Sequence, residues 1–482
     1  MKADIGLIGL AVMGENLVLN MESRGFTVAV FNRTTEKVTN FIEGRGKDKK
    51  IIPSYSLQEL IANLKRPRKV MLMVKAGKPV DDFIEMIIPL LEKGDIIIEG
   101  GNSHFPDTIR RTKYVETKGL LYIGTGVSGG EEGALLGPSL MPGGSKEAWP
   151  YVKDIFHAIS AKTSDGASCC AWIGDNGAGH FVKMAHNGIE YGDMQLICEA
   201  YHLFTQIGGF SHDEMADIFT EWNKAELDSY LIEITSEILK YKDTDGSPIV
   251  TKILDSAGQK GTGKWTVNSA LDEGVPLSLI AESVFARFIS SMKSERVNAS
   301  KVFDYPPTSH PVDNKLFVND IRKALYASKI VSYAQGFNLL RNAAKEYGWE
   351  LNYGEIAMIW RGGCIIRSAF LNRIFEAFTR DPSLPNLIID SYFSGILKEN
   401  NESWRRVISA AVLNGVPVPA MGAALSWFDS YRSAWLPANL LQAQRDYFGA
   451  HTYQRTDRPE GEFFHTNWTG HGGDTSSSTY NA

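Results

Sequence analysis

The sequence has few cysteines, no long apolar run and no long run of one charge. Its four cysteines, Cys169, Cys170, Cys198 and Cys364, lack metal-ligand spacing, and the adjacent pair cannot join distant segments. We therefore expect reduced, buried thiols in a cytoplasmic protein that holds no metal. No apolar stretch approaches the ~20 residues of a membrane span. The start, MKADIGLIGL, lacks the basic region and cleavage site of a signal peptide.

The charge balance argues against several classes of partner. The 482 residues include 50 Lys and Arg against 56 Asp and Glu, a net charge of −6. Without a basic run, neither nucleic acid nor an anionic membrane is expected as a partner, whereas a small anionic ligand needs only a local positive pocket. The chain is 43% hydrophobic, which is ample for burial, and it is too long for one ordinary core. Two or three domains are expected.

The N-terminal segment has the pattern that opens a dinucleotide-binding fold. A short strand at 4–8 runs into a glycine turn at 9–14, a helical pattern follows, and a second strand covers 27–31. Such a turn lets backbone N–H groups and a helix N-terminus face a pyrophosphate. The second strand ends in Asn-Arg-Thr at 32–34, where an NAD-binding chain usually has an acidic residue for the ribose 2′-hydroxyl. Asn and Arg suit a 2′-phosphate and favour NADP; the alternative is that Arg33 is a solvated loop residue.

Strand and helix signals then alternate, with near-continuous apolar strands at 69–74, 95–98 and 120–124. This pattern predicts a mostly parallel sheet covered by helices on both faces. In such sheets, ligands bind beyond the carboxyl ends of the strands. The residues that follow these strands include Val74, Lys75, Ala76, Asn102, Ser103, Ser128, Gly129 and Gly130. The alternative for each is a turn that only reverses the chain, and their coincidence at one edge weighs against it.

The segment from Gly174 to Gln195 carries the strongest chemical signal. It opens with a turn, Asp-Asn-Gly, and then continues without proline, which predicts a long helix. Five polar residues fall within an arc of roughly 140° on that helix. They are Lys183, His186, Asn187, Glu190 and Tyr191. The alternative is the solvated face of an ordinary amphipathic helix, although such a face would be polar over more of the circumference.

After Gly174, strand-like runs vanish and apolar residues recur at helical spacing to about Trp435, so the second domain is expected to be largely helical. Stretches near Ile218 and Met358 resemble each other, and we interpret this as a weak duplication of a helical unit. In the second copy, the equivalents of Lys183 and Glu190 would be about Asn319 and Tyr326. The chemistry is therefore assigned to the first copy.

Three later features also suggest function. The loop 259–265, QKGTGKW, has two lysines suited to phosphate but lacks the spacing of a nucleotide P-loop. Arg287 has mostly apolar neighbours on a predicted helix, so it needs an anionic partner; a structural salt bridge is the alternative to a ligand. From Leu436 the chain is tail-like, yet too aromatic for a disordered linker. We expect this tail to lie on another surface, such as a second subunit.

These patterns predict an α/β Rossmann-like N-terminal domain over 1–176 and a large all-α domain over 177–434. The all-α domain contains an internal helical repeat, with halves at about 177–312 and 313–434. An extended C-terminal tail covers 435–482.

Seven segments together resemble the decarboxylating 6-phosphogluconate dehydrogenase family over essentially the whole chain. They are GLAVMGENLVLNM, NRTTEKV, IIIEGGNSHFPDT, GVSGGEEGALLGPSLMPGG, KMAHNGIEYGDMQLICEAY, GQKGTGKWT and LLQAQRDYFGAHTY, and the last four are highly specific. The broader β-hydroxyacid dehydrogenases share the glycine turn, the GVSGG loop and the helix lysine. Those enzymes are much shorter and lack the duplicated helical domain and the tail.

Position by position, the resemblance implies that Lys183 is the proton acceptor and Glu190 the proton donor. The residues implied to hold the substrate are Asn102, Ser128, Gly129, Gly130, His186, Asn187, Tyr191, Lys260 and Arg287, joined by Arg445 and His451 from the partner subunit of a homodimer. The residues implied to contact NADP are Gly9, Leu10, Ala11, Val12, Met13, Gly14, Asn32, Arg33, Thr34, Val74, Lys75, Ala76 and Asn102.

The resemblance implies oxidative decarboxylation of 6-phospho-D-gluconate to D-ribulose 5-phosphate and CO2, with reduction of NADP, in the cytoplasmic pentose phosphate pathway. The residue types fit this chemistry, because a lysine serves as a base if burial and nearby positive charge lower its pKa. Two alternatives are a β-hydroxyacid dehydrogenase that does not decarboxylate and an NADP-holding protein that has lost catalysis.

Overall fold

The computed structural model describes residues 2–303, 311–472 and 476–477. By its internal contacts the chain divides into two units, one ending at Ala424 and one beginning at Leu425. The first unit opens with an eight-stranded sheet in the order β3-β2-β1-β4-β5-β6-β7-β8. The strands are β1 (Ile5–Ile8), β2 (Val28–Phe31), β3 (Ile51–Pro53), β4 (Lys69–Leu72), β5 (Ile96–Glu99), β6 (Leu121–Ser128), β7 (Ser139–Gly144) and β8 (Gly174–Asp175).

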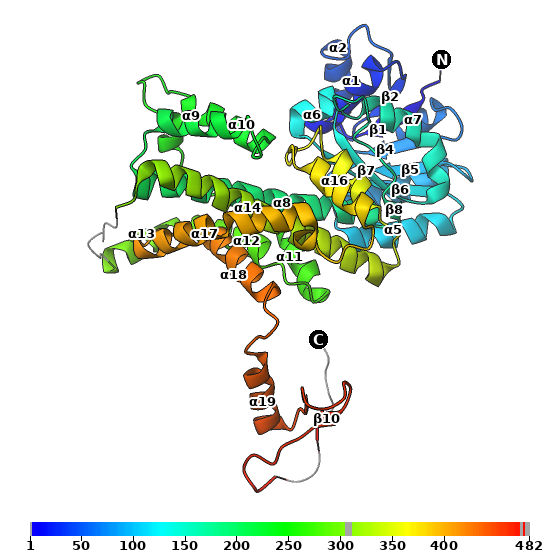
Figure 1. Cartoon of the computed structure of the whole chain (residues 1–482). Helices are drawn as coiled ribbons and strands as arrows, with labels where there is room; N and C mark the ends of the chain where they lie inside the picture. The colour runs from blue at the N-terminus through cyan, green and yellow to red at the C-terminus, as the bar shows by residue number, and fades with distance from the viewer. Residues whose placement is uncertain (1, 304–310, 473–475, 478–482) are drawn as a thin grey trace. The chain divides into compact units, whose positions relative to one another are not determined.

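Helices cover both faces of this sheet, because successive strand residues point to opposite sides and both sides are apolar (Figure 1). In β5, Ile96 and Ile98 join one core cluster, whereas Ile97 joins the other. The helices of the first cluster are α1 (Val12–Ser23), α2 (Glu36–Glu43) and α7 (Trp149–Ile159), and those of the second are α3 (Leu57–Ala62), α4 (Lys78–Ile87) and α5 (Phe105–Thr117). The predicted mostly parallel sheet is confirmed.

One pair of strands departs from the parallel pattern. β6 continues past the predicted end at Gly124 to Ser128 and pairs antiparallel with β7, with Ser128 opposite Ser139. The other neighbouring strands of the sheet are parallel. The sequence of β7, SLMPGG, has no long apolar run, which is why the pattern did not predict it. The short helix α6 (Gly130–Leu136) connects β6 to β7.

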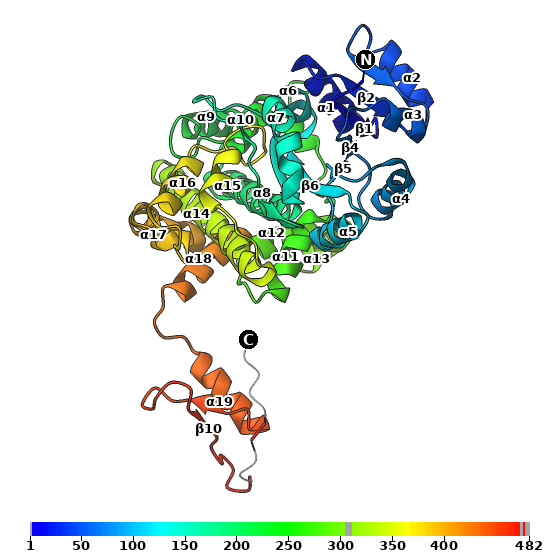
Figure 2. The same ribbon diagram turned by 90° about the vertical axis from the view of Figure 1, so that its right-hand side faces the viewer.

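The long helix α8 (Ala178–Leu203) is the central element of the helical part, with buried residues on all its sides. α14 (Asn314–Tyr347) packs along it (Figure 1, Figure 2). Asp193 of α8 pairs with Lys329 of α14 at 2.5 Å, whereas Phe181 meets Tyr347. Residue numbers thus rise along one helix as they fall along the other, so the two helices are antiparallel.

The predicted internal repeat is visible in the order and pairing of the helices. Each of the long helices α8 and α14 is followed by two shorter α-helices. The segment before the second short helix after α8 pairs with the segment before the second short helix after α14. Ser229 and Ser368 form an antiparallel bridge, in which the Tyr230 amide donates to the Arg367 carbonyl and the Ala369 amide donates to the Asp228 carbonyl, both at 3.0 Å. The remaining helices are α9 (His212–Trp222), α10 (Tyr230–Lys240), α11 (Thr262–Asp272), α12 (Ser278–Ser291), α13 (Lys293–Val302), α15 (Tyr353–Ile359), α16 (Leu371–Arg380), α17 (Ser391–Leu413) and α18 (Pro419–Tyr431).

The second unit is organised around a buried carboxylate. It contains α19 (Ala438–Gly449) and a hairpin of β9 (Tyr453–Gln454) and β10 (Phe463–Phe464). The Asp446 carboxylate accepts hydrogen bonds from the Thr452 amide, the Thr466 amide and the Trp468 indole at 3.0, 3.0 and 2.8 Å. These bonds tie the hairpin to the helix. The outer face of α19 exposes apolar side chains, namely Leu440, Leu441, Tyr447 and Phe448.

The cysteines depart from the expectation in one respect. All four are free thiols, but Cys198 is exposed, whereas Cys169, Cys170 and Cys364 are buried. Cys198 lies one turn along α8 from the exposed Met194, on a side of the helix that nothing in the described chain covers fully. Among the described residues, no helix combines the length and the apolar content needed to cross a membrane.

Candidate active site

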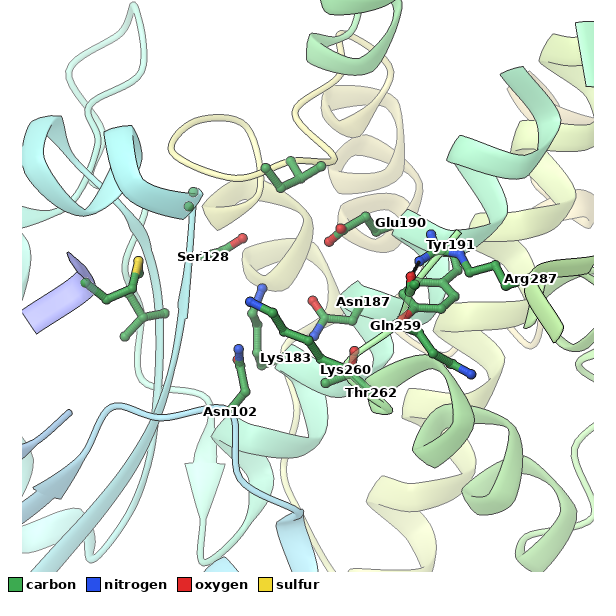
Figure 3. A pocket seen from close by; sticks show the side chains of 16 residues that line it. Asn102, Ser128, Lys183, Asn187, Glu190, Tyr191, Gln259, Lys260, Thr262 and Arg287 are labelled. Carbon is green, nitrogen blue, oxygen red and sulfur yellow. Dashed lines mark hydrogen bonds between the residues drawn. The ribbon is translucent and has the colours of Figure 1, made fainter. Parts of the chain in front are cut away.

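A cavity of about 540 Å³ lies where the carboxyl ends of the strands meet α8. Figure 3 shows Ser128 and Lys183 beside the sheet and Tyr191 and Arg287 among the helices. The residues that line the cavity are Met13, Asn102, Val127, Ser128, Gly129, Gly130, Lys183, Asn187, Glu190, Tyr191, Gly258, Gln259, Lys260, Thr262, Arg287 and Ile365. The cavity therefore brings together all the predicted catalytic and substrate residues of the first unit except His186.

Lys183 reaches this cavity from inside the protein. Its side chain is 6% exposed, and its stem passes so close to β6 that a methyl group on Gly126 would lie 2.4 Å from the Lys183 Cβ. Burial lowers the pKa of Lys183, although the charges of Glu190 and Cys364 act in the opposite direction. Burial alone thus gives the amine the character of a base, without the nearby positive charge that the sequence analysis expected.

His186 lies behind the cavity wall and is fully buried. Its Nε2 is 3.3 Å from the Ser128 hydroxyl, and its Nδ1 is 3.1 Å from the Asn187 side-chain oxygen. Burial, followed by the charge of Lys183, holds the pKa of His186 well below its usual range. In the tautomer protonated on Nδ1, the neutral ring donates to Asn187 and accepts from Ser128. His186 therefore orients two residues of the cavity wall.

Glu190 lies on the same face of α8 as Lys183, two turns further along, which corresponds to about 10 Å along the axis. Its side chain is 22% exposed. Burial raises the pKa of Glu190, while Lys183 and Arg287 act to lower it. A carboxyl group whose proton is retained to higher pH is suited to donate that proton to a ligand. The helix thus presents a base and an acid to one cavity.

The far end of the cavity is positively charged. The Arg287 guanidinium carbon lies 3.5 Å from the centroid of the Tyr191 ring. Within the described chain Arg287 forms no ion pair; its nitrogens contact the Gly258 carbonyl and the Met194 sulfur at 3.4 and 3.5 Å. The structural salt bridge considered from sequence is absent from these residues. Lys260 adds a second cation to this end.

The predicted cofactor turn has the geometry of a phosphate cradle. Gly9 has a φ of +109°, and a side chain there would meet the Met73 carbonyl at 2.4 Å. The turn leads directly into α1, whose N-cap residue Ala11 makes no side-chain cap, so the first N–H groups of the helix remain available to an anion. Asn32 secures the turn, because its side-chain oxygen accepts from the Leu10 amide at 3.0 Å. Arg33 is exposed at the end of β2.

A buried ionic network holds the two neighbouring loops. Arg111 donates to the Glu99 carboxylate at 3.0 Å, to Asp81 at 2.8 Å and to the Gly77 carbonyl at 3.0 Å. Glu99 also accepts from Ser103, which follows Asn102. The network thereby connects the loop at 74–77 with the loop that carries Asn102. Asn102 lines the cavity beside this network.

Arg445 and His451 lie in the second unit, where Gln442 links them. Arg445 donates to the Gln442 side-chain oxygen at 3.1 Å, and the Gln442 side-chain nitrogen donates to the Thr452 carbonyl at 2.6 Å and to the His451 carbonyl at 3.5 Å. The second unit therefore holds this pair together.

Five lining residues were not predicted as site residues, namely Val127, Gly258, Gln259, Thr262 and Ile365. Gly258, Gln259 and Thr262 share the glycine-broken loop with Lys260, so the loop composition was a usable signal. Val127 directly precedes Ser128. Ile365 follows α15 in an irregular segment and carried no signal.

The fold and the site define the class of the protein. A glycine turn with an open helix N-terminus, close to a buried amine of lowered pKa, is the arrangement of a dinucleotide-dependent dehydrogenase that oxidises a hydroxyl group. The residues at the turn fit such a cofactor.

Comparison with known proteins identifies the family, and the chain belongs to the 6-phosphogluconate dehydrogenases. Residues 4–174 match the NAD binding domain of 6-phosphogluconate dehydrogenase, and residues 179–468 match its C-terminal domain. The chain is 61% identical over 482 residues to the decarboxylating 6-phosphogluconate dehydrogenase of Mus musculus, covering 100% of both chains. It is 60% identical over 479 residues to that of Haemophilus influenzae, covering 99% of both.

A solved structure is also similar. Plasmodium falciparum 6-phosphogluconate dehydrogenase, described in its apo form and in complex with NADP+ and with 6-phosphogluconate, superposes with a TM-score of 0.94 at 46% identity. The match covers 96% of this chain and 100% of that one. The resemblance stated from the sequence is thereby confirmed.

Proposed function

We propose that this chain catalyses oxidative decarboxylation of 6-phospho-D-gluconate to D-ribulose 5-phosphate and CO2, with NADP as the oxidant. The observation that carries this proposal is the cavity in which a buried lysine of lowered pKa and a glutamate of raised pKa lie on one face of α8. The family membership supports the substrate, because relatives of about 60% identity bear this activity in their names.

The cofactor is held by the residues predicted from the sequence. The turn at 9–14 takes the pyrophosphate, the segment 32–34 takes the 2′-phosphate, and the loop at 74–76 together with Asn102 borders the nicotinamide end. When bound, NADP supplies the acceptor for the hydride that leaves C3 of the substrate.

Lys183 moves the proton in the first two steps. Its neutral amine accepts the proton of the 3-hydroxyl as the C3 hydrogen leaves with its electron pair, which gives a 3-keto acid and an ammonium group. The ammonium then returns the proton to the 3-oxygen while the bond between C1 and C2 breaks. The electron pair of that bond forms the enediol double bond, and CO2 departs.

Glu190 completes the reaction. Its protonated carboxyl group donates to the enediol carbon that becomes C1 of ribulose 5-phosphate, while the neutral Lys183 amine accepts the proton of the 3-oxygen, and the ketose results. The pKa of Glu190, raised by burial, supports this role because the carboxyl group retains its proton to higher pH than an exposed glutamate does.

The remaining residues place the substrate. Lys260, Arg287 and Tyr191 bind the phosphate, and this binding holds C3 at the reacting position although it is remote from the chemistry. The backbone of Gly129 and Gly130 and the side chains of Asn102, Ser128 and Asn187 bind the carboxylate and hydroxyl groups. His186 acts through Ser128 and Asn187.

We further propose a homodimer in which 1–176 binds cofactor, 177–434 binds substrate and forms the dimer, and the tail 435–482 reaches the partner's active site with Arg445 and His451. The exposed apolar face of α19 supports this arrangement, because such faces are normally covered. Mixing inactive Lys183→Ala subunits with inactive Arg445→Ala subunits should restore part of the activity, since some mixed sites are then intact. No restoration would contradict the shared site. The four free thiols support a reducing, cytoplasmic location.

The direct test is an assay of the purified chain with 6-phosphogluconate and NADP, in which NADPH and CO2 are measured together. Equal amounts of both products are expected. NADPH without CO2 would indicate a β-hydroxyacid dehydrogenase that does not decarboxylate, and neither product would indicate a protein that has lost catalysis.

A further inference from the structure

A second cavity, also of about 540 Å³, borders the same segment 361–367 that contributes Ile365 to the active site. We call it the arginine cleft. Its walls are the loop after α7 and the segments before α10 and α16, and its polar lining includes Lys162, Asp228, Arg361, Arg367, Ser368 and Asn372. We propose that the arginine cleft binds a phosphate-bearing small molecule independently of the active site.

Three cationic side chains line the cleft. Lys162 donates to the His157 carbonyl and the Ser168 hydroxyl, and within the described chain it has no carboxylate partner. A third ammonium hydrogen therefore remains for a ligand, because a lysine has three donors. Its charge is uncompensated by direct contact.

The two arginines have carboxylate partners at the surface. Arg361 contacts Asp165 and the Asn372 side-chain oxygen, both at 3.2 Å, and Arg367 pairs with Glu233. The Asp165 and Glu233 side chains are 55% and 46% exposed. The Arg367–Glu233 pair is exposed on both sides and contributes little, so a dianion in the cleft can compete with it. The Arg361 side chain is 12% exposed, and a dianion can share its guanidinium donors with Asp165. Asp228 adds one negative charge to the wall and sets a limit on the affinity.

A buried hydroxyl without a partner points to a ligand that accepts hydrogen bonds. Ser368 is 5% exposed, lines the cleft, and its oxygen has no hydrogen-bond partner among the described residues. Buried hydroxyl groups are rarely left unsatisfied. A phosphate oxygen beside Ser368 would accept its proton.

One adjacent helix terminus favours an anion in the same place. α16 begins at Leu371, just beyond Ser368, and its N-cap residue makes no side-chain cap. The N-terminus of α10, at Tyr230, is already capped, because the Ser229 hydroxyl accepts from the Ile232 amide. The partial positive charge at the N-terminus of α16 therefore adds to that of the cations.

Donors from several directions match a tetrahedral oxyanion better than a planar carboxylate. The cleft volume also lies in the range of small-molecule sites, about 300–1,000 Å³, which is more than one phosphate group needs. A phosphate ester or a diphosphate therefore fits both the donors and the space.

The test is isothermal titration calorimetry with inorganic pyrophosphate as the probe. The full chain is first saturated with 6-phosphogluconate and NADPH, so that the phosphate end of the active site and the pyrophosphate turn at 9–14 are both filled, and no turnover occurs because the cofactor is already reduced. One further binding event per chain is expected. Its absence in the wild-type protein would overturn the proposal.

Variants locate this event. Lys162→Ala should weaken pyrophosphate binding about tenfold, because a charge-assisted hydrogen bond is lost. Asp165→Asn keeps the size of the side chain and removes the charge that opposes the ligand, so it should tighten binding severalfold. A damaged fold does not bind more tightly, which separates the expected result from misfolding. The surface control Lys113→Ala should change nothing.

Two results would count against the cleft. If Lys162→Ala, Ser368→Ala and Asp165→Asn all bind pyrophosphate as the wild type does, the event lies elsewhere. If Arg287→Ala abolishes it, the probe occupies the active site. Either outcome would overturn the proposal and leave the proposed catalytic function untouched.

Discussion

Arg287 of α12 lies over the ring of Tyr191 of α8, with 3.5 Å between the guanidinium carbon and the ring centroid. The stack fixes the direction of a cation that forms no ion pair within the described chain. A guanidinium held in this way by an aromatic face keeps its N–H groups free for an oxyanion. Tyr191 thus orients the Arg287 guanidinium.

Loss of this cation should raise KM for 6-phosphogluconate more than it lowers kcat. For Arg287→Ala we expect KM to increase about 10–100-fold, because one or two charge-assisted hydrogen bonds to the phosphate are lost. Tyr191→Phe retains the ring and should have a smaller effect than Tyr191→Leu. Steady-state kinetics measure all three variants, and equal effects of Phe and Leu would contradict a role for the ring.

Replacement of Lys183 should abolish turnover without unfolding the chain. Lys183→Met is expected to lower kcat by about 10³-fold or more, because the base is lost, while the affinity for NADP measured by fluorescence stays nearly constant. Burial depresses the pKa of Lys183, so the folded state binds this proton more weakly than the unfolded state. Removing the amine should therefore raise the melting temperature. Retained turnover would refute its assignment as the base.

The pH profile should separate the acid from the base. kcat/KM should rise with pH through the lowered pKa of Lys183, which must be neutral, and fall through the raised pKa of Glu190, which must be protonated. For Glu190→Gln we expect about 10²-fold lower kcat and loss of the alkaline limb. A wild-type alkaline limb in this variant would assign that limb to another group.

The space beside Gly126 sets the position of the lysine. The methyl group of Gly126→Ala would lie 2.4 Å from the Lys183 Cβ, so the amine must shift. We expect kcat to fall by about 10–100-fold, since small misplacements of a catalytic group are costly. Gly395→Ala is the matched control, because a methyl group there meets no atom within 4 Å. Similar losses in both variants would point to a general effect on the fold.

Arg33 should decide the choice of cofactor. Arg33→Asp replaces the partner of the 2′-phosphate by an acceptor for a ribose hydroxyl, and we expect the ratio of kcat/KM for NADP to that for NAD to fall about 100-fold. Lys47→Asp makes the same charge change at another exposed site and should leave the ratio unchanged. An unchanged ratio in Arg33→Asp would show that the 2′-phosphate is recognised elsewhere.

Part of this site could be predicted because its signals are local. The helical period alone places Lys183, Asn187 and Glu190 on one face of α8, whatever packs around it. The glycine turn likewise encodes its own backbone geometry, as the positive φ of Gly9 shows. Such features need no knowledge of the tertiary structure.

The other features of the site and of the fold depend on long-range packing and could not be predicted from local sequence. His186 belongs to the same stripe, but its ring meets Trp360 at 5.6 Å and lies behind the wall, because a wide stripe on a buried helix has an edge that faces protein. Ile365 reaches the cavity from an irregular segment, and β7 is held in the sheet by pairing with β6 and β8. Local sequence patterns do not predict these long-range contacts.

In the proposed mechanism, the proton acceptor and the proton donor both belong to the continuous helix α8, so their spacing is independent of how the nucleotide-binding domain tilts. If the nucleotide-binding domain moved away from the helical domain, NADP would be withdrawn from the substrate. Lys183 and Glu190 would still be in place for decarboxylation and for the final protonation. The proposed mechanism thus implies that loss of CO2 and the final protonation can occur in a partly open enzyme, and that only hydride removal requires closure.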